Sequence, residues 1–321
     1  MIRRPHRNSP LGFPRVLVTG GTGLLGQPLV ERLGWLGYHV TILARRPATA
    51  RIMASAGDVV WGDLADESLV KTLLNPWRWD AVVNLAGPVP KHETVLPEDY
   101  PVLSQHVKIS LHLCLAIPAQ WTGRFIQISG MNVYGSPAYL PVDERHPCRP
   151  VNVYGAAKML SEDLLWSWAQ KINLDCWILR LAGLFTETRR AGAIYTFLRA
   201  ALEHHPLVIS AARPTPWDVL HVNDAVEAIA CALASEARSP GPVNISYGEP
   251  VELTMMAERI VALAGTTSEV QRLHNVVHPV FQLDVTKARR LLDWHPGGLQ
   301  ARLEAMCKAV ESEKSCGVTI R

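Results

Sequence analysis

The chain has 321 residues, of which 48% are hydrophobic and 19% charged, and its formal net charge is +3. These values are typical of a globular protein with a large core, in one large or two medium domains. Lys and Arg are spread along the sequence, so we expect no nucleic-acid partner. No run approaches the roughly 18 to 20 apolar residues that cross a bilayer, and no signal-peptide core follows the basic N-terminus, so we expect a cytoplasmic protein without a membrane contact.

The six cysteines lie far apart and never form a CxxC pair. This spacing argues against a zinc site and against a dense disulfide framework. The sequence therefore predicts no metal centre.

The first half of the chain alternates strand-like and helix-like segments. A β-branched apolar run at 15–19 leads into a glycine-rich turn, and residues 27–36 carry apolar side chains at helical spacing. Further strands are expected at 39–44, 59–61, 81–85, 124–129 and 176–181, and a long helix at 154–171. Such alternation predicts an α/β fold with a Rossmann-type, doubly wound parallel sheet.

The second half changes in pattern and predicts a smaller, mixed α/β C-terminal substrate lobe. Helices are expected at 193–203, 224–234, 253–264 and 299–311, with short strands at 219–222 and 243–245. The predicted domains are a flexible N-terminus (1–12), a dinucleotide-binding domain (13–182, with 211–236 returning to it), a substrate-binding lobe (183–210 and 237–312) and a tail (313–321).

The turn after the first strand carries glycines at three-residue intervals, directly before a helix. Glycines permit a tight turn and a close backbone approach, so a pyrophosphate can sit on the N–H groups at the helix N-terminus. The turn therefore predicts a dinucleotide site, and its candidate cofactor-binding residues are Gly20, Thr22, Gly23, Leu24, Leu25 and Gly26.

The end of the second strand indicates which dinucleotide is bound. Arg45 and Arg46 stand where an NAD-binding protein usually places an acid, and a guanidinium there can pair with a 2′-phosphate. NADP(H) is favoured, and NAD(H) stays possible because both arginines could instead cap a surface loop. Further cofactor contacts are expected from Asp63 and Leu64 near the adenine, and from the small segment Leu85, Ala86 and Gly87.

Tyr154 and Lys158 lie four residues apart, on one face of the predicted long helix. A nearby cation stabilises a phenolate, so such a tyrosine can exchange a proton with an alcohol or a ketone. This pair, following a dinucleotide-binding turn, predicts catalysis of hydride transfer.

With these motifs, the sequence resembles the extended branch of the short-chain dehydrogenase/reductase superfamily, the NAD-dependent epimerase/dehydratase family. The resemblance runs from Arg15 to about Met306 and includes the segments 133–135, 180–183 and 221–224. It implies that Tyr154 is the general acid/base and that Lys158 binds the nicotinamide ribose and tunes Tyr154. Family members often dimerise through helices that include the Tyr-Lys helix, so we expect a homodimer that acts on a small molecule.

The sequence departs from the family at the third catalytic group. Members usually carry Ser or Thr four residues before the tyrosine at 134, and that place is Gly130, with Ser129 one step earlier. Either a backbone shift lets Ser129 serve as a catalytic residue, or this group is missing. Asn132 is a second polar candidate nearby.

Six positions are candidates for substrate contact, namely His92, Gly130, Met131, Asn132, Gly183 and Trp217. The acidic pair of the sugar-nucleotide dehydratases is replaced by Met131 and Asn132, which disfavours a dehydratase. The Asn and Arg with which nucleotide-sugar epimerases grip a diphosphate are replaced by Gly183 and Trp217. His92, in the loop after the fourth strand, is a further candidate for substrate contact.

Three functions stay open from the sequence. The first is an NADP(H)-dependent oxidoreductase that moves a hydride to or from a carbonyl or a secondary alcohol. The second is a nucleotide-sugar epimerase or 4-ketoreductase. The third is a non-catalytic regulator that binds the cofactor without turnover, which the glycine at position 130 suggests.

Overall fold

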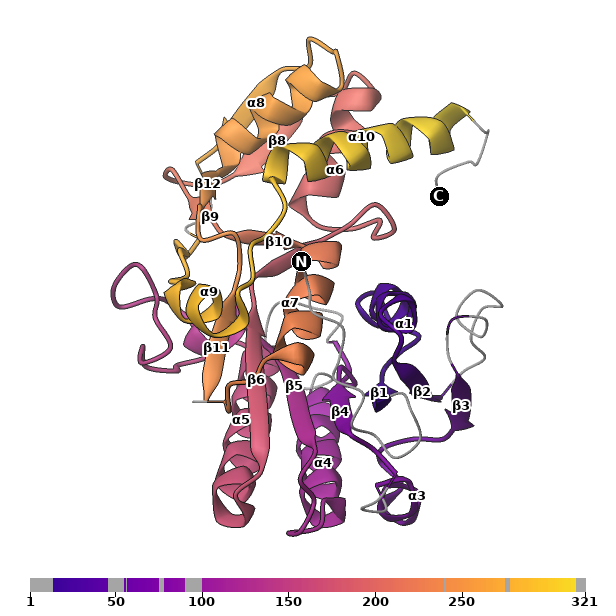
Figure 1. Cartoon of the computed structure of the whole chain (residues 1–321). Helices are drawn as coiled ribbons and strands as arrows, with labels where there is room; N and C mark the ends of the chain where they lie inside the picture. Colours follow the sequence, from indigo (N-terminus) through magenta and orange to yellow (C-terminus); the bar gives the residue numbers. More distant parts are fainter. Residues whose placement is uncertain are drawn as a thin grey trace.

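The computed structural model of the chain describes residues 14–45, 55, 57–74, 78–89, 100–239, 241–274 and 278–315. Within these ranges the chain forms two lobes (Figure 1). One is built around a large parallel sheet, and the other holds the helices α6 (Ala193–Leu202), α8 (Leu253–Leu263) and α10 (Leu299–Ser315).

The large sheet has seven strands in the order β11-β6-β5-β4-β1-β2-β3, and all of its strand pairs are parallel. The strands are β1 (Arg15–Thr19), β2 (His39–Ala44), β3 (Asp58–Trp61), β4 (Ala81–Asn84), β5 (Arg124–Gly130), β6 (Asp175–Leu181) and β11 (Pro242–Ile245). The strand order reverses between β1 and β4, and ligands of such sheets bind beyond the carboxyl ends of the strands at this point. The predicted doubly wound α/β fold is confirmed.

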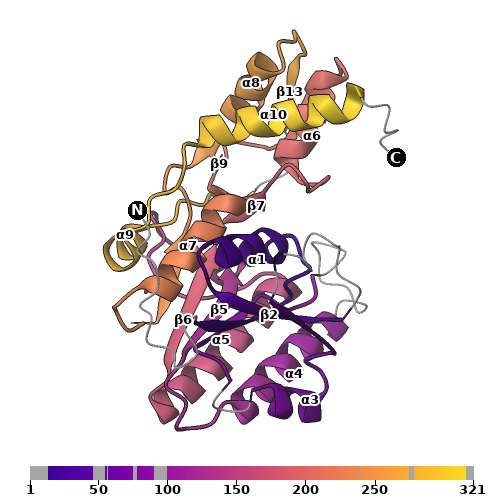
Figure 2. The same ribbon diagram turned by 45° about the vertical axis from the view of Figure 1, so that its right-hand side comes forward.

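Helices cover both faces of this sheet because its strands are apolar on both faces. In Figure 2, α1 (Gly26–Trp35) and α7 (Val222–Ala234) cover one face, while α3 (Glu67–Leu73), α4 (Tyr100–Ala116) and α5 (Val153–Ile172) cover the other. Alternate residues of one strand therefore enter different cores. In β1, Val16 and Val18 pack in the core under α1 and α7, and Leu17 packs in the core under α4 and α5.

The seventh strand corrects one predicted boundary. The sequence predicts that the segment 237–312 belongs to the substrate-binding lobe, but β11 pairs with β6 in the large sheet. Its Val243 and Ile245 are fully buried in the same core as α7, because α7 packs on the sheet and returns the chain beside β6. A strand of four residues cannot indicate by itself which sheet it joins.

The second lobe is built from short two-stranded sheets and three helices around a core of its own. The strand pairs are β7 (Gly183–Phe185) with β10 (Val219–His221), β8 (Leu207–Ser210) with β13 (Val270–Leu273), and β9 (Pro216–Trp217) with β12 (Val251–Glu252). Helix α9 (Thr286–Leu292) lies against α7 and β11, and a short 3-10 helix, η2 (Met131–Tyr134), follows β5. The role of this lobe in binding substrate stays a prediction.

Candidate active site

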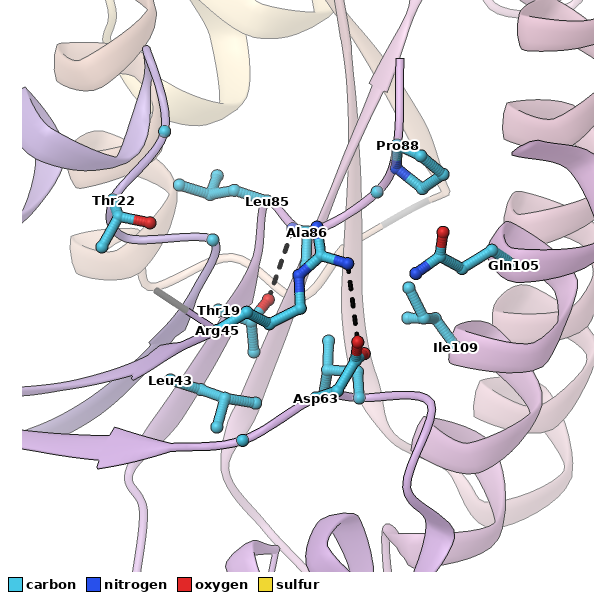
Figure 3. A pocket seen from close by; sticks show the side chains of 15 residues that line it. Thr19, Thr22, Leu43, Arg45, Asp63, Leu85, Ala86, Pro88, Gln105 and Ile109 are labelled. Carbon is cyan, nitrogen blue, oxygen red and sulfur yellow. Dashed lines mark hydrogen bonds and ion pairs between the residues drawn. The ribbon is translucent and has the colours of Figure 1, made fainter. Parts of the chain in front are cut away.

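A cavity of about 470 Å³ lies at the carboxyl ends of β1, β2 and β4 (Figure 3). Its walls include most of the residues predicted to bind the cofactor, namely Gly20, Thr22, Gly23, Arg45, Asp63, Leu64, Leu85, Ala86 and Gly87. Other lining residues were not predicted, and these are Thr19, Leu43, Gly62, Pro88, Gln105 and Ile109. Gln105 and Ile109 lie four residues apart on one face of α4. This helical spacing, in the segment that follows 85–87, is the sequence pattern from which both could have been predicted.

The glycine-rich turn forms one wall of the cavity and depends on two of its glycines. Gly20 has φ +69°, and a Cβ there would stand 3.0 Å from the backbone nitrogen of Ala86. A Cβ on Gly26 would overlap the carbonyl oxygen of Gly20. The N-cap residue of α1, Leu25, makes no side-chain capping bond, so the first N–H groups of the helix are not capped by it. This cradle fits a pyrophosphate.

Leu24, Leu25 and Gly26 do not line the cavity themselves. Leu24 is exposed, Leu25 is buried in the core under α1, and Gly26 allows the turn to close. Their direct contact with a cofactor stays a prediction. Arg46 lies outside the described residues.

Two opposite charges meet across the mouth of the cavity. The Arg45 guanidinium lies 3.5 Å from a carboxylate oxygen of Asp63, and the two side chains stay 57% and 41% exposed (Figure 3). The second carboxylate oxygen of Asp63 accepts from the amide of Ala65 at 2.9 Å. An exposed pair of this kind is weak, so Arg45 can turn toward a bound anion at little cost.

Tyr154 and Lys158 lie at the start of α5, one turn apart. Asn152 caps this helix by accepting a hydrogen bond from the amide of Gly155 at 2.8 Å. The Lys158 ammonium lies 5.6 Å from the centroid of the Tyr154 ring and donates to the carbonyl oxygen of Ile128 at 3.1 Å. Lys158 is only 4% exposed. The predicted pair is therefore together, with its cation held out of water.

His106 of α4 was missed by the sequence analysis, although it lies between the cavity wall and Tyr154. Its ring contacts the Tyr154 ring edge-on at 6.1 Å between centroids, and its Nε2 donates to the carbonyl oxygen of Pro88 at 2.9 Å. A Cβ on Gly87 would overlap the imidazole. Burial and the nearby Lys158 ammonium lower the pKa of His106 to about 4, so the ring is neutral at physiological pH.

Gly130, which stands where a third catalytic group was expected, carries no side chain. Ser129 is 4% exposed, and its hydroxyl has no hydrogen-bond partner among the described residues. Gly130 has extended backbone, and a Cβ there would stand 3.6 Å from Oδ1 of Asn132 and 3.7 Å from the carbonyl oxygen of Leu181. A hydroxyl-bearing side chain therefore has room at position 130.

The predicted substrate residues come from different segments of the chain, and Trp217 packs against the core that contains Met131. Gly183 and Trp217 meet, because a Cβ on Gly183 would stand 3.0 Å from Cζ2 of the indole, and both line a small hollow of about 20 Å³ in the second lobe. Met131 is 9% exposed and packs in the core, and Asn132 is half-buried. His92 lies outside the described residues.

The described part of the chain holds neither a candidate metal-binding cluster nor a candidate membrane-spanning helix. It contains no group of three or more His, Cys, Asp or Glu side chains that could hold a metal ion. No described helix is both long enough and apolar enough to span a membrane.

Residues 16–246 match the model of the NAD dependent epimerase/dehydratase family. A UDP-glucose 4-epimerase of Azospirillum brasilense is 29% identical over an alignment of 273 residues, which covers 78% of this chain and 78% of its own. A dTDP-6-deoxy-L-talose 4-dehydrogenase (NAD(P)(+)) of Kitasatospora kifunensis is 26% identical over 88% of this chain and 91% of its own. The structure is similar in fold to a UDP-glucuronic acid 4-epimerase of Bacillus cereus in complex with UDP-glucuronic acid and NAD, with TM-score 0.80, 23% identity, and coverage of 93% and 99% of the two chains.

Proposed function

We propose that this chain, which belongs to the NAD dependent epimerase/dehydratase family, transfers a hydride between a nicotinamide dinucleotide and a secondary alcohol or carbonyl carbon of a small molecule. Its family makes it an enzyme of the extended short-chain dehydrogenase/reductase type. Tyr154 exchanges the proton of the reacting oxygen, and the Lys158 ammonium stabilises the phenolate and binds the ribose. The observation that carries this proposal is the buried ammonium 5.6 Å from the Tyr154 ring.

The chain's own residues prepare the site in three ways. The turn at Gly20 and the N-terminus of α1 hold the pyrophosphate, and the backbone of Leu85–Gly87 forms the adjoining wall. A nicotinamide dinucleotide held there would supply or accept the hydride. His106 fills the space beneath Gly87 with a neutral ring, so it adds no second positive charge beside Lys158. The substrate would lie between this wall and the second lobe.

NADP(H) is the preferred cofactor in this proposal. Arg45 lines the cavity at the end of β2. Because its ion pair with Asp63 is exposed and weak, the guanidinium is available to a 2′-phosphate. NAD(H) is the alternative, because a solved structure of similar fold is in complex with NAD and Asp63 can accept from ribose or adenine groups.

A second candidate is the epimerisation or 4-keto reduction of a nucleotide sugar. The names of the relatives favour it, since they are a UDP-glucose 4-epimerase and a dTDP-6-deoxy-L-talose 4-dehydrogenase. Against it stands the apolar contact of Gly183 with Trp217, which supplies no charge for a diphosphate.

The test combines cofactor titration with turnover. NADPH and NADH are titrated by nicotinamide fluorescence, and the protein is then assayed with UDP-glucose and with a panel of small ketones. Tyr154→Phe should lower turnover by about a thousandfold or more while cofactor affinity changes little. Tyr139→Phe, an exposed tyrosine outside the cavity, is the matched control. Net oxidation of NADPH supports the oxidoreductase, whereas epimer formation without net oxidation supports the epimerase.

Two results contradict the proposal. Absence of binding of both dinucleotides would remove its basis. An unchanged turnover of Tyr154→Phe would show that Tyr154 does not exchange the proton of the reacting oxygen.

A further inference from the structure

Three polar side chains form a row across neighbouring strands, directly beneath the active site. Thr19 lies opposite Asn84 in the pairing of β1 with β4, and Asn84 lies opposite Gln127 in the pairing of β4 with β5. The Thr19 hydroxyl donates to Oδ1 of Asn84 at 2.6 Å, and Nδ2 of Asn84 donates to Oε1 of Gln127 at 2.7 Å. All three side chains are at most 2% exposed.

The row connects two parts of the site. At one end, the backbone amide of Ala86, in the wall of the cavity, donates to the Thr19 hydroxyl oxygen at 3.4 Å (Figure 3). At the other end, Nε2 of Gln127 donates to the carbonyl oxygen of Ile128 at 2.9 Å, and this is the oxygen that accepts from the Lys158 ammonium at 3.1 Å. A carbonyl oxygen has two lone pairs, and these two donors use both.

The direction of every bond in the row follows from its two ends. The Ala86 amide can only donate, so the Thr19 oxygen accepts there and its proton is free for Asn84. The Ile128 carbonyl can only accept, so Gln127 must present its amide nitrogen to that carbonyl and its oxygen to Asn84. The bonds thus point one way, from the cavity wall toward the Ile128 carbonyl, and bonds in such a chain polarise and strengthen one another.

Packing alone does not require polar side chains at these positions. One layer earlier on the same face, the same three strands carry Leu17, Val82 and Phe125, which are also paired opposite one another and fully buried. An apolar layer would avoid the cost of burying three polar groups. The polar row occurs in the layer that adjoins the cavity and Lys158.

We propose that Asn84 and Gln127 are positioning residues, which act with Thr19 to hold the Ile128 carbonyl, and thereby the Lys158 ammonium, in fixed register with the cavity wall at Ala86. The proposal rests on the proposed function in that Lys158 serves Tyr154. It adds that the position of the Lys158 ammonium depends on side chains of β1, β4 and β5 that touch neither the phenol nor the cofactor's reacting end.

The test removes the row in the whole protein with two variants. Gln127→Met keeps the side-chain shape but leaves the buried Asn84 amide without its acceptor, which destabilises the protein and can impair folding. The double variant Asn84→Leu/Gln127→Met removes both partners, which is far better tolerated. Ser161→Ala is the matched control, since its hydroxyl is buried on α5 and bonds only the carbonyl of Ala157 among the described residues.

The first readout needs neither substrate nor turnover. Acetylation of lysines by acetic anhydride is followed by peptide mass spectrometry, with the exposed Lys171 of the same helix as internal reference. Lys158 should label about tenfold faster in the folded double variant than in the wild type, and at the wild-type rate in Ser161→Ala. The second readout is the midpoint of the pH profile of kcat, which should move by about half a unit or more in the double variant alone.

Each possible result either supports or overturns the proposal. A folded double variant with wild-type labelling of Lys158 or with an unchanged pH midpoint overturns the proposal. A full turnover of Tyr154→Phe would instead refute the proposed function, and in that case faster labelling of Lys158 would still support its positioning by Gln127. If Gln127→Met does not fold, the double variant supplies the result.

Discussion

The indole of Trp217 lies against Gly183 so closely that a Cβ on residue 183 would stand 3.0 Å from Cζ2 of the ring. Residue 183 begins β7 and residue 217 ends β9, so the contact forms only when the strands of the second lobe assemble. It explains why a polar side chain is absent from position 183, since the indole occupies the neighbouring space. Gly183 and Trp217, which replace the Asn and Arg of nucleotide-sugar epimerases, thus belong to one structural feature.

Gly183→Asn should lower the stability of the protein by about 1–3 kcal/mol, because the new side chain must displace the indole. The double variant Gly183→Asn/Trp217→Ala should recover part of that loss, and thermal unfolding of both variants and of Trp217→Ala measures the coupling. Strictly additive effects of the two substitutions would contradict the contact.

Arg45→Ala should weaken NADPH binding by about tenfold, or about 1.4 kcal/mol, and leave NADH binding nearly unchanged. The reason is the loss of the guanidinium that lines the cavity. Fluorescence titration measures both affinities, and Arg213→Ala, at an exposed arginine, is the control. Equal weakening of both cofactors would refute the assigned selectivity.

Gly130→Ser should raise kcat by about tenfold or more if the third catalytic group is missing, because a hydroxyl there can donate to the reacting oxygen. The backbone is extended and the nearest atoms to the new Cβ lie at 3.6 and 3.7 Å, so the side chain fits. Gly298→Ser is the control, since a Cβ on that glycine meets no atom within 4 Å.

The same assay decides between the two alternatives for Ser129. If Ser129 already serves as the third group, Ser129→Ala lowers kcat strongly and Gly130→Ser gives no gain. If the group is missing, Ser129→Ala has little effect on kcat.

His106→Gln should make the stability of the protein less sensitive to acid. The pKa of His106 is lowered to about 4 from 6.5, so between these values the unfolded chain binds a proton that the folded chain does not. Stability is therefore lost as the pH falls from about 6.5 to 4, by up to about 3 kcal/mol for this shift. Urea unfolding at several pH values measures it.

The comparison of wild type with variant isolates His106. Burial also raises the pKa of Asp218 to about 6, which gives the opposite slope, but Asp218 is present in both proteins. A stability difference that stays constant between pH 7 and 4 would show that His106 is not buried as a neutral ring.

We propose a homodimer through α4 and α5, and Leu111→Asp/Leu115→Asp should convert it to a monomer. These leucines of α4 are 44% and 52% exposed, and Leu160 of α5 is 38% exposed. Sedimentation velocity measures the state, and Leu273→Asp, at an exposed leucine of the second lobe, is the control. A monomeric wild type at micromolar concentration would refute the dimer.

The sequence by itself determined the features that depend on near neighbours. Glycines three residues apart between a strand and a helix indicate a tight turn, and Tyr154 and Lys158 share a helix face wherever that helix lies. The alternation of strands and helices likewise sufficed for the doubly wound fold.

The tertiary structure alone decided which distant side chains meet. Nothing local in the sequence brings Thr19, Asn84 and Gln127 into one row, turns His106 toward Tyr154, or adds β11 to the large sheet. These contacts depend on strand order, register and helix packing, which arise from the summed burial of the whole chain and leave no short-range pattern behind.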